Sequence, residues 1–423
     1  MFALIRTEIA SGPFGLMTFL SLLLIGGDLI AIQVGGLTLR IVFPLLMGTI
    51  AFMFMRGPQE VNFNKPLLFM FSWLALAGAT STTVSFAPGK SIGYTFWVLF
   101  NFFIIITLCY NFSRYKPPLT VLSLWFWIFR IHVALAALSF FYIVLTTHAL
   151  ATRPHLWFYE ASYLAIFLVG YFGAALYLVL NDGRRWLPDL FIALLGIICT
   201  ASATGLAGVA MTVILNAVIS QNRLKLIVIA AILSSIFLGT LFLFFQKTGY
   251  YDLMASFVLN PKFSADVLIG RGGNRWVRAL VGLQAFQQHP WFGVGIGGDA
   301  AYMEHTSFSD YVWQYMNNWS GIDEAGQPFV NIIIEVLGTM GIMGFLPFLV
   351  ILIYSVMTAI RIRKLPDYQY PLAAFMAFWS MFLALQFEGT FLRYYLWTAY
   401  GLAFGMIGRL KPKSDQLAAP IEG

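Results

Sequence analysis

The sequence predicts an all-α integral membrane protein with about twelve transmembrane helices and one large loop outside the membrane. Hydrophobic residues make up 60% of the chain and charged residues only 10%, whereas soluble domains are nearer half apolar and a quarter charged. Basic residues gather in short segments between long apolar runs. A single long polar segment, 246–328, interrupts the runs. Together these features favour one membrane domain over several soluble ones.

Each expected span is an apolar run near the length of about 20 residues that crosses a bilayer as a helix. The first run is too long for the core of a signal peptide and no small-residue cleavage site follows it, so we expect a retained span. The seventh and eighth runs are short, which leaves a single re-entrant pair as an alternative. The expected spans are 14–33, 37–55, 66–86, 91–110, 119–147, 157–180, 187–203, 205–220, 225–245, 329–357, 370–386 and 390–408.

The spans divide the chain into three parts. Residues 1–245 hold the first nine helices, 246–328 form the loop with an amphipathic helix, and 329–423 hold the last three helices and a tail. If the N-terminus is cytoplasmic, fifteen Lys and Arg residues lie inside and nine outside, five of them in the long loop. Long loops count little in the positive-inside rule, so the short segments split fifteen to four. This split predicts that both termini are cytoplasmic.

Several functional classes are excluded by composition. The net charge of +7 does not indicate nucleic-acid binding, because the basic residues serve orientation. The cysteines Cys109 and Cys199 lie in or at the ends of apolar runs and cannot form a disulfide framework. The sequence has no HExxH, CxxC or P-loop motif, so we expect no metal ion, no haem, no other cofactor and no nucleotide hydrolysis.

The stretch from 269 to 298 carries the strongest chemical signal. Arg271, Arg275 and Arg278 stand at spacings of four and three at the start of an amphipathic helix, so they share one face. Guanidinium groups bind phosphate oxygens in a bidentate way and keep their charge, which suits a pyrophosphate. The alternative is a surface helix whose arginines snorkel to anionic headgroups.

A glycine-rich turn follows, His289-Pro290-Trp291-Phe292-Gly293-Val294-Gly295-Ile296-Gly297-Gly298. Such glycines allow backbone to come close to a ligand or another chain. Aromatic residues are also dense in the 246–328 loop. They suit contact with sugar or lipid, although an interfacial aromatic belt is an equal alternative.

These motifs resemble the O-antigen ligase and Wzy-type polymerase superfamily. The ordered set is a W-x-x-A-L helix, then "hP-x-x-GvGxG", then Asn331-Ile332-Ile333-Ile334-Glu335, with Gly338, Gly341 and Gly344 after it. The resemblance implies a GT-C-like fold and an inverting, metal-independent glycosyltransferase in the bacterial inner membrane. It also implies undecaprenyl-pyrophosphate-linked glycan as substrate, used on the periplasmic face, and a chain-length regulator as a candidate partner.

The resemblance also assigns a first site residue. In the family, an Arg fourteen residues before the "hP" motif contacts the pyrophosphate, and here that position is Arg275. Arg271 and Arg278 would support it. Metal-dependent enzymes of the other GT-C branch hold a cation with acidic residues in the first outer loop. Here that loop reads Gln33-Val34-Gly35-Gly36-Leu37, so no metal is expected.

Two departures favour a polymerase of O-antigen or exopolysaccharide over a ligase that transfers glycan to lipid A–core. Ligases carry an Arg in an "S-R-G" setting, where this chain reads Thr200-Ala201-Ser202-Ala203-Thr204-Gly205. Ligases also carry a His immediately before Asn331, where this chain has Val330. A glycolipid transporter is an alternative of another class, but the paired halves common in transporters are not evident.

Other ionisable residues compete for the site, because charges near a membrane interior are costly and often functional. Glu335 is a candidate base or a partner for an Arg of the loop, and His305 could replace the missing His. Arg130 is more consistent with neutralising a buried acid or snorkelling inward than with contacting substrate, and His289 is more consistent with positioning the turn. The further candidate substrate contacts are Asn331, Glu160, Arg153, Glu388 and Arg393, the last four of which could instead form structural ion pairs.

Overall fold

The structure is a computed structural model that describes residues 18, 20–24, 31–34, 37–40, 42–56, 64–147, 153–158, 160–219, 274–303, 305–306 and 329–410. Within these ranges five helical segments are long and apolar enough to cross a membrane. They are Pro88–Arg114 (α5 Pro88–Leu99, η2 Phe100–Ile105 and α6 Ile106–Arg114), α7 Pro118–Thr147, α8 Ala161–Asn181, α17 Ile332–Ile362, and Gln369–Phe387 (α18 Gln369–Ala384 and η5 Leu385–Phe387).

The remaining described elements are shorter. They are β1 Ala31–Val34, β2 Leu37–Arg40, α3 Val42–Arg56, α4 Lys65–Thr82, η3 Arg184–Trp186, α9 Leu187–Cys199, α10 Ala203–Ile219, α14 Asn274–Gln288, α15 Asp299–Met303 and α19 Tyr394–Leu410. Ten of the twelve expected spans therefore coincide with helices, and the expected span 225–245 lies outside the described residues. The predicted count of twelve stays a prediction.

The boundary between the first two expected spans is wrong. Ala31–Val34 and Leu37–Arg40 pair as antiparallel strands, with Val34 opposite Leu37, and the next helix begins only at Val42. Short apolar runs do not distinguish a strand from the end of a helix. The overlooked signal is the Gly35-Gly36 pair between two short runs rich in β-branched and aliphatic residues, which is typical of a two-residue hairpin.

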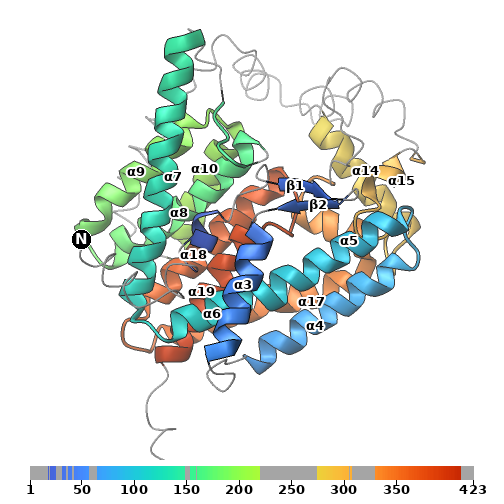
Figure 1. Ribbon diagram of the computed structural model, residues 1–423, viewed down its shortest axis with the longest axis horizontal. Coiled ribbons are helices and arrows are strands. Elements are labelled where there is room, and N and C mark those ends of the chain that lie inside the picture. The colour runs from blue at the N-terminus through green and yellow to red at the C-terminus, as the bar shows by residue number, and fades with distance from the viewer. Residues whose placement is uncertain are drawn as a thin grey trace, which may run out of the picture.

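Helix α8 forms the centre of the bundle. Every residue from Ala161 to Leu180 is buried, as expected for a helix that is hydrophobic all round. It packs against α9, α10 and α18, and α18 packs in turn against α19. In Figure 1, α14 and α15 lie next to the turn that joins α4 and α5, away from α7 and α9.

The glycine-rich turn 289–298 docks into a kink of α17. The Val294 N–H donates to the Gly338 carbonyl at 2.9 Å, and the Ile342 N–H donates to the Pro290 carbonyl at 2.8 Å. Gly341 has a φ of 61° inside α17, which breaks the helical ladder and frees these backbone groups. The glycines thus allow close approach of backbone, as expected, but the backbone they approach belongs to the same chain.

An ion pair inside the bundle confirms one of the two roles expected for Arg130. Its Nε and Nη2 donate to the two carboxylate oxygens of Asp189, each at 2.8 Å, and the Tyr171 hydroxyl donates to the same carboxylate. The guanidinium also lies 4.8 Å from the ring centroid of Trp127. Asp189 is 2% exposed, so its charge is neutralised where water is excluded. Arg130 therefore links α7 to α9.

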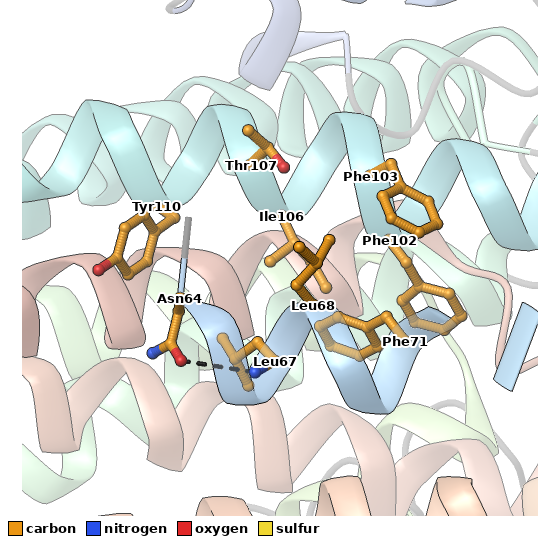
Figure 2. Close-up of a pocket in the computed structure, with 9 residues that line it drawn as sticks. All are labelled: Asn64, Leu67, Leu68, Phe71, Phe102, Phe103, Ile106, Thr107 and Tyr110. Carbon is orange, nitrogen blue, oxygen red and sulfur yellow. Dashed lines mark hydrogen bonds between the residues drawn. The ribbon is translucent and has the colours of Figure 1, made fainter. Parts of the chain in front are cut away.

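A groove opens between the first half of α4 and the η2–α6 segment (Figure 2). Its lining residues carry no formal charge: Asn64, Leu67, Leu68, Phe71, Phe102, Phe103, Ile106, Thr107 and Tyr110. Asn64 caps α4, and its side chain accepts a hydrogen bond from the Leu67 N–H. The glycine-rich turn contacts the opposite end of α4, where Ser81 accepts from the Ile296 N–H at 3.3 Å. The described lining of the groove thus offers no charged side chain to a ligand.

Candidate functional site

Arg275, at the start of α14, forms an ion pair with Glu388, which follows η5. The Thr204 hydroxyl, on the first turn of α10, donates to the same Oε1 oxygen of Glu388 at 3.0 Å. The Glu388 side chain is 5% exposed, whereas that of Arg275 is 38% exposed. The contact joins three segments that are far apart in sequence. The Arg275 side chain therefore stays partly exposed beside a buried carboxylate.

Arg278 lies one helical turn further along α14 and is 6% exposed. Burial lowers the pKa of its guanidinium, while the Tyr163 hydroxyl, Glu388 and Asp299 act in the opposite direction. An Arg keeps its charge in proteins, so this buried cation balances the acidic groups around it. Arg275 and Arg278 therefore share one face of α14, as their spacing predicted, and both interact with Glu388. Arg271 lies outside the described residues.

Asp299 follows the glycine-rich turn and begins α15. Burial raises the pKa of its carboxyl group to about 6, and this rise is opposed by the backbone N–H groups of Ala300 and Asp299 and by the charges of Arg278 and Lys90. A carboxyl group that titrates near neutral pH is a candidate for proton transfer. The docking of the glycine-rich turn therefore also places an ionisable group beside Arg278.

Residues 388–393, here called the 388–393 turn, present Glu388 and Arg393 to the site. The Glu335 carboxylate accepts hydrogen bonds from the backbone N–H groups of Thr390 and Phe391. The Asn101 amide donates to the Leu392 carbonyl at 2.9 Å. The indole of Trp397 also donates to the Phe391 carbonyl at 2.6 Å. Buried side chains from three helices thus fix this turn.

Asn101 reaches the turn because it lies in the π-helical segment η2. Such π-helical segments are rare and are often found at functional sites. The same amide also donates to the Trp97 carbonyl at 3.1 Å. The wide turn of helix therefore supplies one of the supports of the 388–393 turn.

Arg393 and Glu388 each contact a residue of another helix. The Arg393 guanidinium lies 3.5 Å from the centroid of the Tyr163 ring on α8, while Glu388 contacts Arg275. Arg153 and Glu160 also have separate surroundings. Arg153 is exposed, and the Glu160 carboxylate accepts from the Ser162 hydroxyl at 3.0 Å. Of these four residues, the structure brings Glu388 and Arg393 to the arginines of α14.

Asn331 and Glu335 have structural partners at the start of α17. Asn331 is the N-cap, and its side-chain oxygen accepts from the Ile333 and Ile334 N–H groups at 3.0 and 3.2 Å. Capping of this kind satisfies N–H groups that have no partner within the helix. Both side chains thus orient backbone at the site. The buried Glu335 carboxylate accepts from backbone N–H groups of the 388–393 turn.

The two loop histidines lie together in an aromatic cluster. The ring of Phe86 lies 5.5 Å from His289, 5.6 Å from His305 and 5.4 Å from Tyr302, measured between ring centroids. His289 therefore helps to position the turn, as expected. His305 is exposed and packs in the same cluster, and its role as a replacement for the missing His stays a prediction.

Sequence reasoning passed over three groups of the site, namely Thr204, Tyr163 and Asp299. Thr204 falls where ligases of the resembled family carry an Arg, and its hydroxyl contacts Glu388. Asp299 directly follows Gly297-Gly298. An acidic residue directly after a glycine-rich turn is a signal that could have marked it as a candidate site residue. Nothing in the sequence distinguishes Tyr163 from the other aromatic residues of α8.

The described residues contain no group of three or more His, Cys, Asp or Glu side chains placed to hold a metal ion. The cations described at the site are the guanidinium groups of Arg275, Arg278 and Arg393, together with Lys90, whose charge acts on Asp299. Such a set can bind an anion and can stabilise negative charge that develops on a leaving group.

Comparison with known families agrees with the motifs. Residues 190–349 match the Wzy_C family model, which is described as O-antigen ligase. The matched region covers α9, α10, α14, α15 and the first part of α17. Glu388 and Arg393 lie beyond the matched residues. No curated protein matches the chain.

Proposed function

We propose that the chain is a Wzy-type polymerase that joins lipid-linked repeat units of O-antigen or exopolysaccharide. The donor is a glycan on undecaprenyl pyrophosphate, and the acceptor is the sugar end of a second lipid-linked unit. The transfer inverts the anomeric centre, needs no metal and takes place on the periplasmic face of the inner membrane. The observation that carries the proposal is the partly exposed guanidinium of Arg275 within a cluster of three arginines.

The pyrophosphate would serve as both handle and leaving group. As the anomeric C–O bond breaks, negative charge develops on the phosphate oxygen. Preorganised cations in a site of low dielectric stabilise such charge strongly. Arg275 supplies the open guanidinium, and Arg278 supports it from within. This division of roles follows from their exposures of 38% for the Arg275 side chain and 6% for Arg278.

A ligase is the second candidate, favoured by the description of the matched family. Two positions argue against it. Val330 is buried and has no ionisable group where ligases have a His. In the segment where ligases have an Arg, Thr204 donates to Glu388. Both replacements leave the pyrophosphate site intact and remove groups that the ligase reaction would use.

A deletion strain distinguishes the two. Loss of long glycan with a single repeat unit still attached to core supports the polymerase. Loss of all glycan from core, with polymer retained on the lipid carrier, supports the ligase and overturns the polymerase. A transporter would instead leave the lipid-linked unit on the cytoplasmic face, which protection from a membrane-impermeant glycosidase would reveal.

A further inference from the structure

Glu388 already pairs with Arg275, whose guanidinium the donor's pyrophosphate would bind. Arg275 donates through Nη2 to Oε1 of Glu388, so one arm of its fork is engaged before any anion arrives. A pyrophosphate that binds Arg275 in a bidentate way would compete with this carboxylate. Two anions cannot share one guanidinium without mutual repulsion. Donor binding therefore requires an exchange of partners at Arg275.

We infer that Glu388 is the general base of the transfer, and that it becomes available when the donor's pyrophosphate replaces it on Arg275. This inference rests on the proposed function and adds the residue that accepts the proton. The exchange also sets an order, because the base is held by Arg275 until the donor is bound.

The proposed step is balanced. The acceptor hydroxyl oxygen forms a bond to the anomeric carbon while the bond from that carbon to the pyrophosphate oxygen breaks. The electron pair of the broken bond leaves with undecaprenyl pyrophosphate, where Arg275 meets the new charge. The hydroxyl proton passes to the Glu388 carboxylate, and water takes it up afterwards. No metal ion or redox partner enters the step.

Glu388 fits this role better than Glu335 and Asp299, the two other buried carboxyl groups described near the arginines. The Glu335 carboxylate accepts from two backbone N–H groups. Protonation of this carboxylate would weaken both hydrogen bonds and disturb the 388–393 turn. Asp299 is 5% exposed and beside the buried Arg278. Glu388 instead contacts the one arginine of the pair that is substantially exposed. Among the carboxyl groups that the structure describes near these arginines, it is therefore the one best placed to meet the donor.

The surroundings of Glu388 allow the exchange. When Arg275 turns to the donor, the carboxylate keeps the Thr204 hydroxyl at 3.0 Å and the electrostatic interaction with Arg278. A buried charge that loses every partner is strongly destabilising, but here one hydrogen bond and one cation remain. Thr204 also holds Oε1 in place, which leaves the position released by Arg275 for the acceptor hydroxyl.

The test measures binding and turnover separately in Glu388→Gln. The probe is undecaprenyl pyrophosphate, bound to the full chain in lipid nanodiscs. Because the substitution removes the competing anion, the dissociation constant should fall on the order of fivefold. Polymer made in the deletion strain should fall at least about a hundredfold at matched protein level. The matched control is Asp182→Asn, another carboxylate paired with an Arg, which should change neither quantity.

Two results would overturn the inference. One is polymer at wild-type level from Glu388→Gln. The other is weaker binding of undecaprenyl pyrophosphate by Glu388→Gln, which would mean that Glu388 only orders Arg275. If Glu388→Gln does not fold, Glu388→Asp keeps a carboxylate and should give measurable polymer. A folded Glu388→Asp that binds the probe and makes no polymer counts against the inference.

The proposed function fails in a different way. It fails when the deletion strain makes polymer of the same length with and without the wild-type gene. The inference about Glu388 fails when the wild-type gene restores polymer but the Glu388 variants give the contrary results described above. The two outcomes are therefore separate.

Discussion

The Glu335 carboxylate on α17 accepts a hydrogen bond from the Phe391 N–H at 3.2 Å, across 56 positions of sequence. The same oxygen accepts from the Thr390 N–H. This relationship ties the first turn of α17 to the turn that carries Glu388 and Arg393. It explains why a carboxylate is present near the end of an apolar helix, where an unpaired charge would be costly.

Replacing Glu335 by Ala should leave two backbone N–H groups of the 388–393 turn without their partner. Each buried donor left unsatisfied costs about 1–3 kcal/mol, so the thermal midpoint in detergent should fall clearly. Glu335→Gln keeps an acceptor oxygen, so its thermal midpoint should fall less. Glu160→Ala, which removes a carboxylate that accepts from Ser162, is the control. Equal midpoints for Glu335→Ala and wild type would show that the turn is held without Glu335.

Replacing Arg275 by Ala should reduce polymer about a hundredfold or more, because a contact to the developing pyrophosphate is lost. Arg275→Lys should also be impaired, since it keeps the charge but not the planar fork. The measurement is polymer length on gels at matched protein level. Normal polymer from both variants would mean that Arg275 only anchors α14.

Arg278→Ala should act differently, through the amount of folded protein. The residue is buried beside Glu388 and Asp299, and removing one partner of buried charges costs about 3–5 kcal/mol. The expected result is a lower yield and a lower thermal midpoint. Arg275→Ala, whose side chain is 38% exposed, should fold at nearly wild-type yield. The opposite ranking of the two yields would contradict the assignment of roles.

The stability of the protein should fall as pH rises from about 4 to about 6 because of Asp299. Its pKa is raised to about 6 by burial, so in this window the folded state keeps a proton that the unfolded state has lost. The free energy of unfolding should therefore fall by about 3 kcal/mol as the pH rises through this window, with no further change above about pH 6. Thermal midpoints measured from pH 4 to 7 should show a flatter profile for Asp299→Asn. An identical profile for both proteins would remove Asp299 as the cause.

Alanine at Gly341 or Gly293 should prevent the glycine-rich turn from docking on α17. Both residues have positive φ, and a Cβ at either would lie 2.4 Å from backbone atoms of the other segment. Backbone cannot give way cheaply, so we expect a loss of several kcal/mol in stability. Gly93→Ala on α5 is the control, because nothing lies within 4 Å of its Cβ position. Thermal midpoints like that of Gly93→Ala would show that the two segments move apart freely.

The sequence predicted what depends on local pattern and missed what depends on distant pairing. The spacing of Arg275 and Arg278 was enough to place them on one face of α14. Their acidic partner Glu388 stands 113 positions from Arg275, and no periodicity carries that information. The same limit left open whether Glu388 pairs with Arg393, its neighbour in sequence. The strands at 31–40 were missed because their apolar residues continue the runs on either side.

The kink of α17 was also hidden, for a physical reason. Gly338, Gly341 and Gly344 recur at three-residue intervals, which suits a close helix–helix contact as well as a break. Only the docking of the 289–298 turn shows which applies. Conversely, a buried acid was one of the two roles expected for Arg130, because an unpaired charge in a span is unfavourable, although its partner Asp189 could not be named.

The pairing of Arg130 with Asp189 has a consequence for how the protein enters the membrane. The two residues are 59 positions apart, so α7 leaves the ribosome and meets the insertion machinery well before α9 exists. During that interval the guanidinium has no carboxylate, and an Arg near a helix centre adds about 2.5–3.5 kcal/mol to the free energy of insertion. The mean hydropathy of 2.1 in α7 offsets this cost. We therefore expect the apolar residues of α7 to drive its insertion. When α9 arrives later, Asp189 pairs with Arg130 and the ion pair joins the two helices.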